Sequence, residues 1–315
     1  MKREVLIYNN GKYERELICA EKCLRLIYEN PLGGVTLPYL FKRKALSRLY
    51  GIYCRTGFSA KSIPKFIKQN QVDMTGCEGP YKNFADFFIR EKKGISFPDI
   101  PGRMGSPCEG FASIYTGIIP EKLIAAKDSL FSLAELFDNE ELAEAYRGGI
   151  MLRIRLAPAN YHRMHFFDDG VVTGSKFIDG DLFSVSPLAV DRIARLYCRN
   201  KRGLILFSSQ NFGDIVIVEV GATFVGSIVH CFSKVDGVND PLLKEDLISA
   251  ENSIPKKEPI PVRRGQQASY FLPGGSLVLV FFKKDAFTPS NTLIEQTFAG
   301  YETKICVGDQ LGEVL

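Results

Sequence analysis

The stretch from Tyr270 to Phe282, YFLPGGSLVLVFF, constrains the fold most, because a tight turn leads directly into an apolar strand. Pro273, Gly274 and Gly275 form the turn and bring Ser276 to the start of the strand. The two glycines leave the Gly275 carbonyl unshielded and allow strained backbone angles. A hydroxyl one residue after an exposed carbonyl can attack it, which is the geometry of a backbone N→O acyl shift. Gly-Gly-Ser before a strand is also an ordinary turn, so this interpretation needs other residues.

Short β-rich runs dominate the chain from residue 105 onward. They are FASIYTGI, IMLRIRLA, GVVTGSKFI, GLILFSS, DIVIVEVGATFVGSIVHCF and SLVLVFF. Turn-forming residues separate them, as an antiparallel sandwich or barrel requires. Helices are expected in SLAELFDNEELAEAYR and PLAVDRIARLYC, and residues 233–268 are expected to form a polar excursion with one strand.

The N-terminal part has a different pattern. Asn9-Asn10-Gly11 predicts a hairpin turn within residues 4–18, and a helix is expected from Ala20 to Glu29. Asn83 is a candidate cap for a short helix, NFADFFIRE. We therefore predict an α+β protein, in which an N-terminal hairpin and basic helices lie on a β-rich, sandwich-like or barrel-like core. A Pro- and Gly-rich segment separates the two predicted domains, 1–95 and 96–315.

Composition narrows the classes of function. A net charge of +4 over 315 residues is mild and does not indicate a nucleic-acid binder. Eight cysteines without a CxxC pair, and three histidines, argue against a dedicated Cys/His metal site and favour reduced thiols in the cytoplasm. The N-terminus lacks the apolar run of a signal peptide, and no stretch has the ~20 apolar residues of a spanning helix. Any contact with a membrane is expected at its surface.

Residues 35–72 carry many basic residues and no acidic one. One helical face has the apolar residues Phe41, Ala45, Leu49, Ile52 and Tyr53, and a separate stripe has Lys44, Arg48 and Arg55. Such a basic amphipathic helix suits an anionic lipid surface. A solvated helix packed on its own domain fits the composition equally well, and a nucleic-acid patch fits it less well.

Two histidines, His162 and His165, lie together in the segment YHRMH. In a strand they would point to opposite faces, whereas in a turn both could line a pocket. Their spacing is not that of HExxH metalloproteases. Glu109, in the turn SPCEG, could orient a histidine in a Ser-His-acid set, although an exposed turn position is the ordinary explanation of such a glutamate.

The chain resembles the phosphatidylserine decarboxylase family. The matching segments are KRKALSRLYG, IPKFIKQNQVDM, NFADFFIRE, SPCEG, YHRMH, GDLFSV, NFGDIVIVEVGATFVGSIV and the final GGS before an apolar strand. They extend from about residue 30 to residue 285 in the order of the family. YHRMH and VGATFVGSI are the most specific of them.

The resemblance implies self-cleavage. Ser276 Oγ would attack the Gly275 carbonyl, and the resulting ester would break to leave a β chain, 1–275, and an α chain, 276–315, that begins with a pyruvoyl group. His165, which matches the second histidine of the family motif, would be the base. Glu109, at the position of the family's acidic residue, would orient His165.

The resemblance also implies the substrate. The pyruvoyl group made from Ser276 would form a Schiff base with the amine of phosphatidylserine, and phosphatidylethanolamine would be released after loss of CO₂. His162 would be the proton donor in this decarboxylation. No metal is expected. The expected partners are phosphatidylserine in an anionic membrane surface, the chain's own α and β pieces and a second copy in a homodimer, with no nucleic acid. The expected location is peripheral, at the cytoplasmic face of the cell membrane.

Two departures from the family pattern leave alternatives open. The acidic residue is Glu109 rather than aspartate, and Leu277 replaces a hydroxyl residue after the cleavage site. One alternative is a serine hydrolase that uses Ser276, His165 and Glu109, although no GxSxG elbow surrounds the serine. The other is an unprocessed, lipid-binding relative.

Overall fold

The computed structural model describes residues 5–29, 44–124, 130–222, 228–232 and 258–315. A ten-stranded sheet dominates it, and all described neighbours in the sheet are antiparallel except β1 and β17. In spatial order its strands are β13 (Ile260–Val262), β9 (Gly170–Ile178), β10 (Arg202–Ser209), β11 (Gly213–Val220), β15 (Ser276–Phe282), β7 (Ile150–Leu156), β4 (Gly110–Thr116), β17 (Glu302–Ile305), β1 (Leu6–Asn9) and β2 (Lys12–Arg15). The predicted α+β class is confirmed, and the described strands leave the sheet open between β13 and β2 rather than closed as a barrel.

Smaller sheets flank the large one. One has the order β12 (Ile228–His230), β14 (Gln267–Phe271), β8 (Arg163–His165), and another has the order β16 (Thr288–Pro289), β18 (Gln310–Glu313), β3 (Arg103–Gly105). A two-stranded ribbon pairs β5 (Leu123–Ile124) with β6 (Leu130–Phe131).

Strand β15 lies at the centre of the large sheet and is buried along its whole length. Its side chains alternate between two hydrophobic clusters: Leu277, Leu279 and Phe281 belong to one, and Val278, Val280 and Phe282 to the other. Burial of each such side chain is worth about 1.5–3 kcal/mol. The strand that begins with Ser276 is therefore firmly anchored on both faces.

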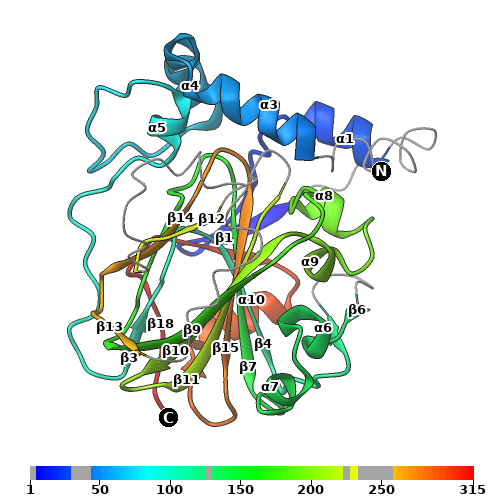
Figure 1. The fold of residues 1–315 in the computed structure, drawn as a ribbon, viewed down its shortest axis with the longest axis vertical. Coiled ribbons are helices and arrows are strands. Elements are labelled where there is room, and N and C mark those ends of the chain that lie inside the picture. Colours follow the sequence, from blue (N-terminus) through cyan, green and yellow to red (C-terminus); the bar gives the residue numbers. More distant parts are fainter. Residues whose placement is uncertain (1–4, 30–43, 125–129, 223–227, 233–257) are drawn as a thin grey trace.

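Helices gather at one end of the molecule, above the strands in Figure 1. They are α1 (Glu21–Glu29), α3 (Lys44–Arg55), the 3₁₀ helix η1 (Gly57–Ser62), α4 (Ile63–Asn70) and α5 (Phe84–Phe88). A third hydrophobic cluster, which includes Cys54, Ile63, Phe84, Phe87 and Phe88, joins α3, α4 and α5. The other helices are α6 (Leu133–Phe137), α7 (Glu140–Glu144), α8 (Pro187–Val190), α9 (Leu196–Arg199) and α10 (Asn291–Phe298). Of the described helices, none has the length and apolar character needed to cross a bilayer.

The local predictions are largely confirmed. The predicted hairpin is β1–β2, with positive φ at Asn10 (45°) and Gly11 (86°), as its turn type requires. The expected helix over 132–147 is two short helices, because Asp138 adopts a left-handed conformation (φ 52°) and Asn139 caps the second helix. The expected helix at PLAVDRIARLYC is likewise split into α8 and α9. Residues 233–257 of the polar excursion lie outside the described part, and β13 is the strand expected in it.

The N-terminal hairpin extends the large sheet, because β1 pairs with β17. A buried ion pair reinforces this connection, in which Arg155 of β7 contacts both Glu16 and Glu302. The domain boundary near residue 95 stays a prediction.

Candidate active site

The candidate site lies where the chain passes twice between the ten-stranded sheet and the small sheet of β8, β12 and β14. Residues 157–162 connect β7 to β8, and residues 272–275 connect β14 to β15. Because β15 pairs with β7 and β14 pairs with β8, the two connections lie side by side. Ser276 is opposite Leu156, and the Phe271 N–H donates to the His162 carbonyl over 3.0 Å. Strand register thus brings together residues that are more than a hundred positions apart.

Ser276 and His162 are in direct contact. Ser276 Oγ lies 3.3 Å from His162 Nδ1, and both residues are completely buried. His162 Nε2 lies 3.1 Å from the carbonyl oxygen of Ala157, which can only accept a hydrogen bond. Nε2 must therefore carry the ring proton, so Nδ1 is free to accept the proton of the serine hydroxyl. This is the arrangement of a general base and its nucleophile.

The surroundings keep His162 neutral. The Phe88 ring stacks on the imidazole, with centroids 4.0 Å apart. Burial, and then the charge of Arg90, lower the pKa of His162 to about 3. The ring is therefore an uncharged proton acceptor over the whole physiological range.

Gly274, two residues before Ser276, has an unusual backbone conformation. Gly274 has φ 147°, in the region that favours glycine. A Cβ added to Gly275 would meet Val185 and Leu156 only at ordinary contact distances, 3.6 and 3.8 Å. Sterics at Gly275 alone therefore do not demand glycine, whereas the conformation at Gly274 does. Leu277, the departure after the cleavage site, is fully buried in a hydrophobic cluster.

His165 makes a different set of contacts. Its Nδ1 lies 2.9 Å from the carbonyl oxygen of Gly265, and its Nε2 lies 3.0 Å from the Tyr161 hydroxyl. Burial lowers the pKa of His165, so this ring also favours the neutral form. Its backbone N–H donates to the Pro107 carbonyl over 2.8 Å, which places the SPCEG turn beside β8. Among the described residues, the contacts of His165 do not reach Ser276.

Glu109 is hydrogen-bonded to Asn160, in the connection 157–162 that contains His162. Its Oε1 accepts a hydrogen bond from Asn160 Nδ2 over 2.9 Å, and Lys92 Nζ lies 3.7 Å from its Oε2. Asn160 Oδ1 in turn accepts from the Ala157 N–H over 2.8 Å, and the carbonyl of that residue fixes the ring of His162. In the described structure Glu109 thus acts on His162 through Asn160, and its contacts do not include His165.

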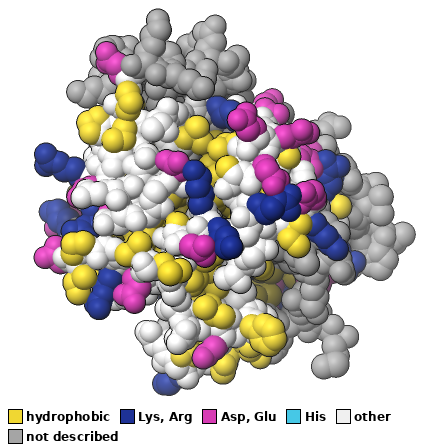
Figure 2. Space-filling view, turned by 90° about the horizontal axis from the view of Figure 1, so that it is seen from below, with side chains coloured by type: hydrophobic (Ala, Val, Ile, Leu, Met, Phe, Trp, Pro, Cys, Tyr) yellow, Lys and Arg dark blue, Asp and Glu magenta, His cyan; other side chains and the backbone are white. Residues whose placement is uncertain are grey.

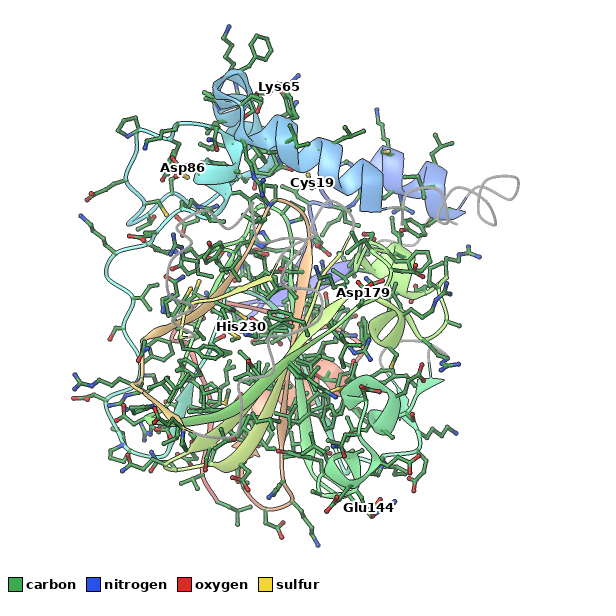
Figure 3. The ribbon with its side chains drawn as sticks, viewed as in Figure 1. Cys19, Lys65, Asp86, Glu144, Asp179 and His230 are labelled. Carbon is green, nitrogen blue, oxygen red and sulfur yellow. The ribbon has the colours of Figure 1, made fainter. Side chains whose placement is uncertain are left out.

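A cavity of about 270 Å³ opens beside the cleavage site. Its walls are mostly apolar and come from both the helical end and the sheet, including Leu24, Tyr50, Phe84, Phe88, Pro158, Gly274 and Gly275. Cys19, which also lines the cavity, lies beneath α3 in Figure 3. A larger cavity, of about 360 Å³, is lined by Arg153 and Glu302 and includes neither Gly274 nor Gly275 in its wall. The first cavity is therefore the one suited to bring an apolar molecule to the Gly-Gly turn before Ser276.

Sequence reasoning missed three contributors to this site. Phe88 and Arg90 lie in the segment NFADFFIRE and Asn160 directly precedes YHRMH, but no local pattern assigns these three residues a role in the site. Among the described residues, no cluster of three or more His, Cys, Asp or Glu could hold a metal ion.

Comparison with known proteins shows which family the chain belongs to. The model of the family "Phosphatidylserine decarboxylase" matches residues 83–313. A "Phosphatidylserine decarboxylase proenzyme" of Clostridium novyi is 36% identical over 308 residues, covering 96% of each chain. Proteins with the same name from Clostridium perfringens and Ruminiclostridium cellulolyticum are 35% identical (98% of this chain, 99% of the relative) and 34% identical (99% and 98%). The chain belongs to the phosphatidylserine decarboxylase family.

Proposed function

We propose that this protein cuts itself between Gly275 and Ser276 and then decarboxylates phosphatidylserine to phosphatidylethanolamine. The observation that carries the proposal is the contact between the Ser276 hydroxyl and the unprotonated Nδ1 of His162, directly after a Gly-Gly turn. The word "proenzyme" in the names of the relatives supports a precursor that is cut. An apolar cavity lined by Gly274 and Gly275, the two residues before Ser276, supports a lipid substrate.

Self-cleavage can be written with the residues in place. Nδ1 of His162 takes the hydroxyl proton as Ser276 Oγ attacks the carbonyl carbon of Gly275, and the C–N bond breaks as the amide nitrogen takes up a proton. The ester then loses the α-proton of residue 276 while its Cβ–O bond breaks, which releases the carboxylate of Gly275. One water hydrolyses the remaining group, ammonia leaves, and the ketone of a pyruvoyl group stays on piece 276–315.

The site fits such a group and the reaction on lipid. A ketone at position 276 would supply an electron sink for decarboxylation without a metal. Because His162 lies against residue 276, it is placed to hold the proton that must return to the substrate carbon after CO₂ leaves. The roles that the resemblance assigns to His165 and Glu109 stay predictions, and we propose His162 as the base of self-cleavage because its contact is the direct one.

We further propose that the helical end docks on an anionic membrane, peripherally and at its cytoplasmic face. Tyr50 and Cys54 of α3 pack inward, whereas Leu49, Ile52 and Tyr53 are exposed, and so is Phe58 of η1. The exposed residues support the lipid-surface interpretation of this helix, and the inward residues support packing on its own domain. Phe41 and the basic residues before position 44 lie outside the described part of the chain, as do the side chains of residues 44–48.

Charge supports the same orientation. Exposed lysines follow the apolar patch at positions 61, 65 and 68, and Lys65 is labelled on α4 at this end in Figure 3. At the opposite end of the molecule, seen in Figure 2, basic and acidic side chains are interspersed. Apolar side chains flanked by cations suit an anionic bilayer, whereas mixed charges suit water. The expected homodimer stays a prediction.

The function is tested with purified protein and phosphatidylserine in anionic vesicles. We expect release of CO₂ and of phosphatidylethanolamine, and loss of both in Ser276→Ala. Ser175→Ala is the matched control, because Ser175 also follows a glycine and is buried in a strand but lies in β9, away from the site. Vesicle binding without CO₂ would indicate the lipid-binding alternative. Release of fatty acid that depends on Ser276 in an uncut chain would indicate the hydrolase.

A further inference from the structure

Arg90, which follows α5, is buried with part of its guanidinium unpaired. The residue is 3% exposed. Its Nη2 donates to the carbonyl oxygens of Ala159 (3.1 Å) and Asn160 (3.2 Å), and its guanidinium lies over the Phe87 ring. Among the described residues, neither Nε nor Nη1 has a hydrogen-bond partner, although both are buried. Unpaired donors on a buried cation are costly, so a partner beyond the described residues is indicated.

The position of Arg90 points to the active site. Arg90 and His162 hold the same connection, since Arg90 binds the carbonyls of residues 159 and 160 and His162 binds that of Ala157. Phe88, two residues before Arg90, stacks on the His162 ring. The charge of Arg90 also contributes to the lowered pKa of His162, which places the two groups within electrostatic reach. The guanidinium of Arg90 is therefore a neighbour of the group that contacts Ser276.

The chain before cleavage encloses this region. Ser276 and His162 are fully buried, and Gly274 and Gly275 form part of the wall between them and the apolar cavity. Cleavage after Gly275 turns this wall into a chain end. A ligand that reaches residue 276 from the cavity then meets the connection 157–162, to which the guanidinium of Arg90 is hydrogen-bonded.

We propose that Arg90 binds the phosphodiester of the lipid headgroup and so positions the headgroup beside residue 276. This inference rests on the proposed function. The phosphoserine headgroup has two anionic groups, the carboxylate and the phosphodiester, and they behave differently during the reaction. The carboxylate leaves as neutral CO₂, so a cation bound to it would stabilise the reactant more than the transition state and slow the reaction. The phosphate keeps its charge throughout, and a guanidinium matches its geometry.

The first test compares soluble amines on the cut enzyme. Glycerophosphoserine, glycerophosphoethanolamine, L-serine and ethanolamine are each trapped on residue 276 with cyanoborohydride, and the adduct is measured by intact mass per cut 276–315 piece. We expect Arg90→Gln to lower trapping of both phosphodiesters at least tenfold at subsaturating concentration and to change the two free amines less than twofold. Arg90→Lys, which keeps the charge, should trap the phosphodiesters less than the wild type and more than Arg90→Gln.

The control is Arg202→Gln. Arg202 is also buried and bound to carbonyl oxygens, namely those of Leu136, Cys198, Asn200 and Glu135, outside the site. This substitution should lower the stability of the protein without changing the ratio of trapped phosphodiester to trapped free amine. An equal loss for all four amines in Arg90→Gln, or a loss for the two serine compounds alone, overturns the proposal. The second of these outcomes assigns Arg90 to the carboxylate.

A second measurement does not depend on whether the Arg90 variants are cut. Cut wild-type enzyme is treated with phenylglyoxal, and modification of Arg90 is mapped by peptide mass. We expect phenylglyoxal to modify Arg90. Glycerophosphoethanolamine should prevent this modification, whereas ethanolamine should not. An unreactive Arg90, or one that the phosphodiester leaves unprotected at saturation, overturns the proposal. If the wild type traps no amine at position 276, the proposed function fails and this inference with it. If it traps all four and only the Arg90 results fail, the function stands.

Discussion

Self-cleavage should proceed at nearly the same rate at pH 5 and at pH 7.5, because His162 keeps an unprotonated Nδ1 over this range. Burial and the neighbouring Arg90 lower the pKa of His162 to about 3. With that pKa about 99% of the rings are neutral at pH 5, compared with about 3% for an ordinary histidine of pKa about 6.5. An ordinary histidine base would thus slow the reaction about 30-fold between the two pH values.

The stability of the uncut chain should depend on pH although the rate does not. The pKa of His162 in the folded chain is below its unfolded value, so the unfolded chain binds the extra proton between about pH 6.5 and about pH 3. The contribution to stability is complete above about pH 6.5 and is lost as the pH falls through this window. At pH 5 the loss is about 2 kcal/mol, because 1.5 pH units cost about 1.4 kcal/mol each. Urea unfolding of Ser276→Ala at both pH values measures it.

The assay follows precursor from a short pulse of cell-free synthesis, diluted into buffers from pH 5 to pH 8. The loss of the full-length band gives a first-order rate at each pH. Ser276→Ala serves as the blank, since it cannot split by this route. A roughly 30-fold fall in rate with a midpoint near pH 6.5 would refute the reasoning, because it would show a base exposed to solvent rather than the buried ring of His162.

Three further changes test separate parts of the site. His162→Gln should slow splitting by about 10²–10⁴-fold, the usual contribution of a general base, and by more than His165→Gln does; equal effects in a gel time course would contradict the direct role of His162. Asn160→Ala removes the partner of a buried carboxylate and should cost about 2–3 kcal/mol in urea unfolding while it slows splitting; unchanged stability would show that the hydrogen bond from Asn160 to Glu109 is dispensable. Ile52→Ser combined with Phe58→Ser should weaken binding to anionic vesicles roughly tenfold in flotation assays with an unchanged melting temperature, since both side chains are exposed. Retained binding would place the membrane contact elsewhere.

Local signals were enough to predict much of the fold. The Asn-Gly turn placed the first hairpin, and the apolar runs GVVTGSKFI and SLVLVFF coincide with β9 and β15 residue for residue. The expected helix over 132–147 is interrupted, because Asp138 adopts a left-handed conformation and Asn139 caps a second helix. The order of the ten strands depends on pairings between distant segments, which no local pattern contains.

The site could be predicted in composition but not in contacts. The resemblance brought Ser276, both histidines and Glu109 to attention, yet the two histidines of YHRMH are chemically equivalent in the sequence. Which of them meets Ser276 depends on the register of β15 on β7 and of β14 on β8. Arg90 could not be distinguished from a surface arginine, because its burial comes from packing against residues about seventy positions later in the chain.

The mass and terminal chemistry of the purified protein test the central claim most directly. The account predicts two pieces, 1–275 and 276–315, of which the smaller has no N-terminal amine and gains the mass of two hydrogens on borohydride reduction. A single chain of 35.2 kDa that persists under native conditions, with an intact bond between Gly275 and Ser276, would contradict it.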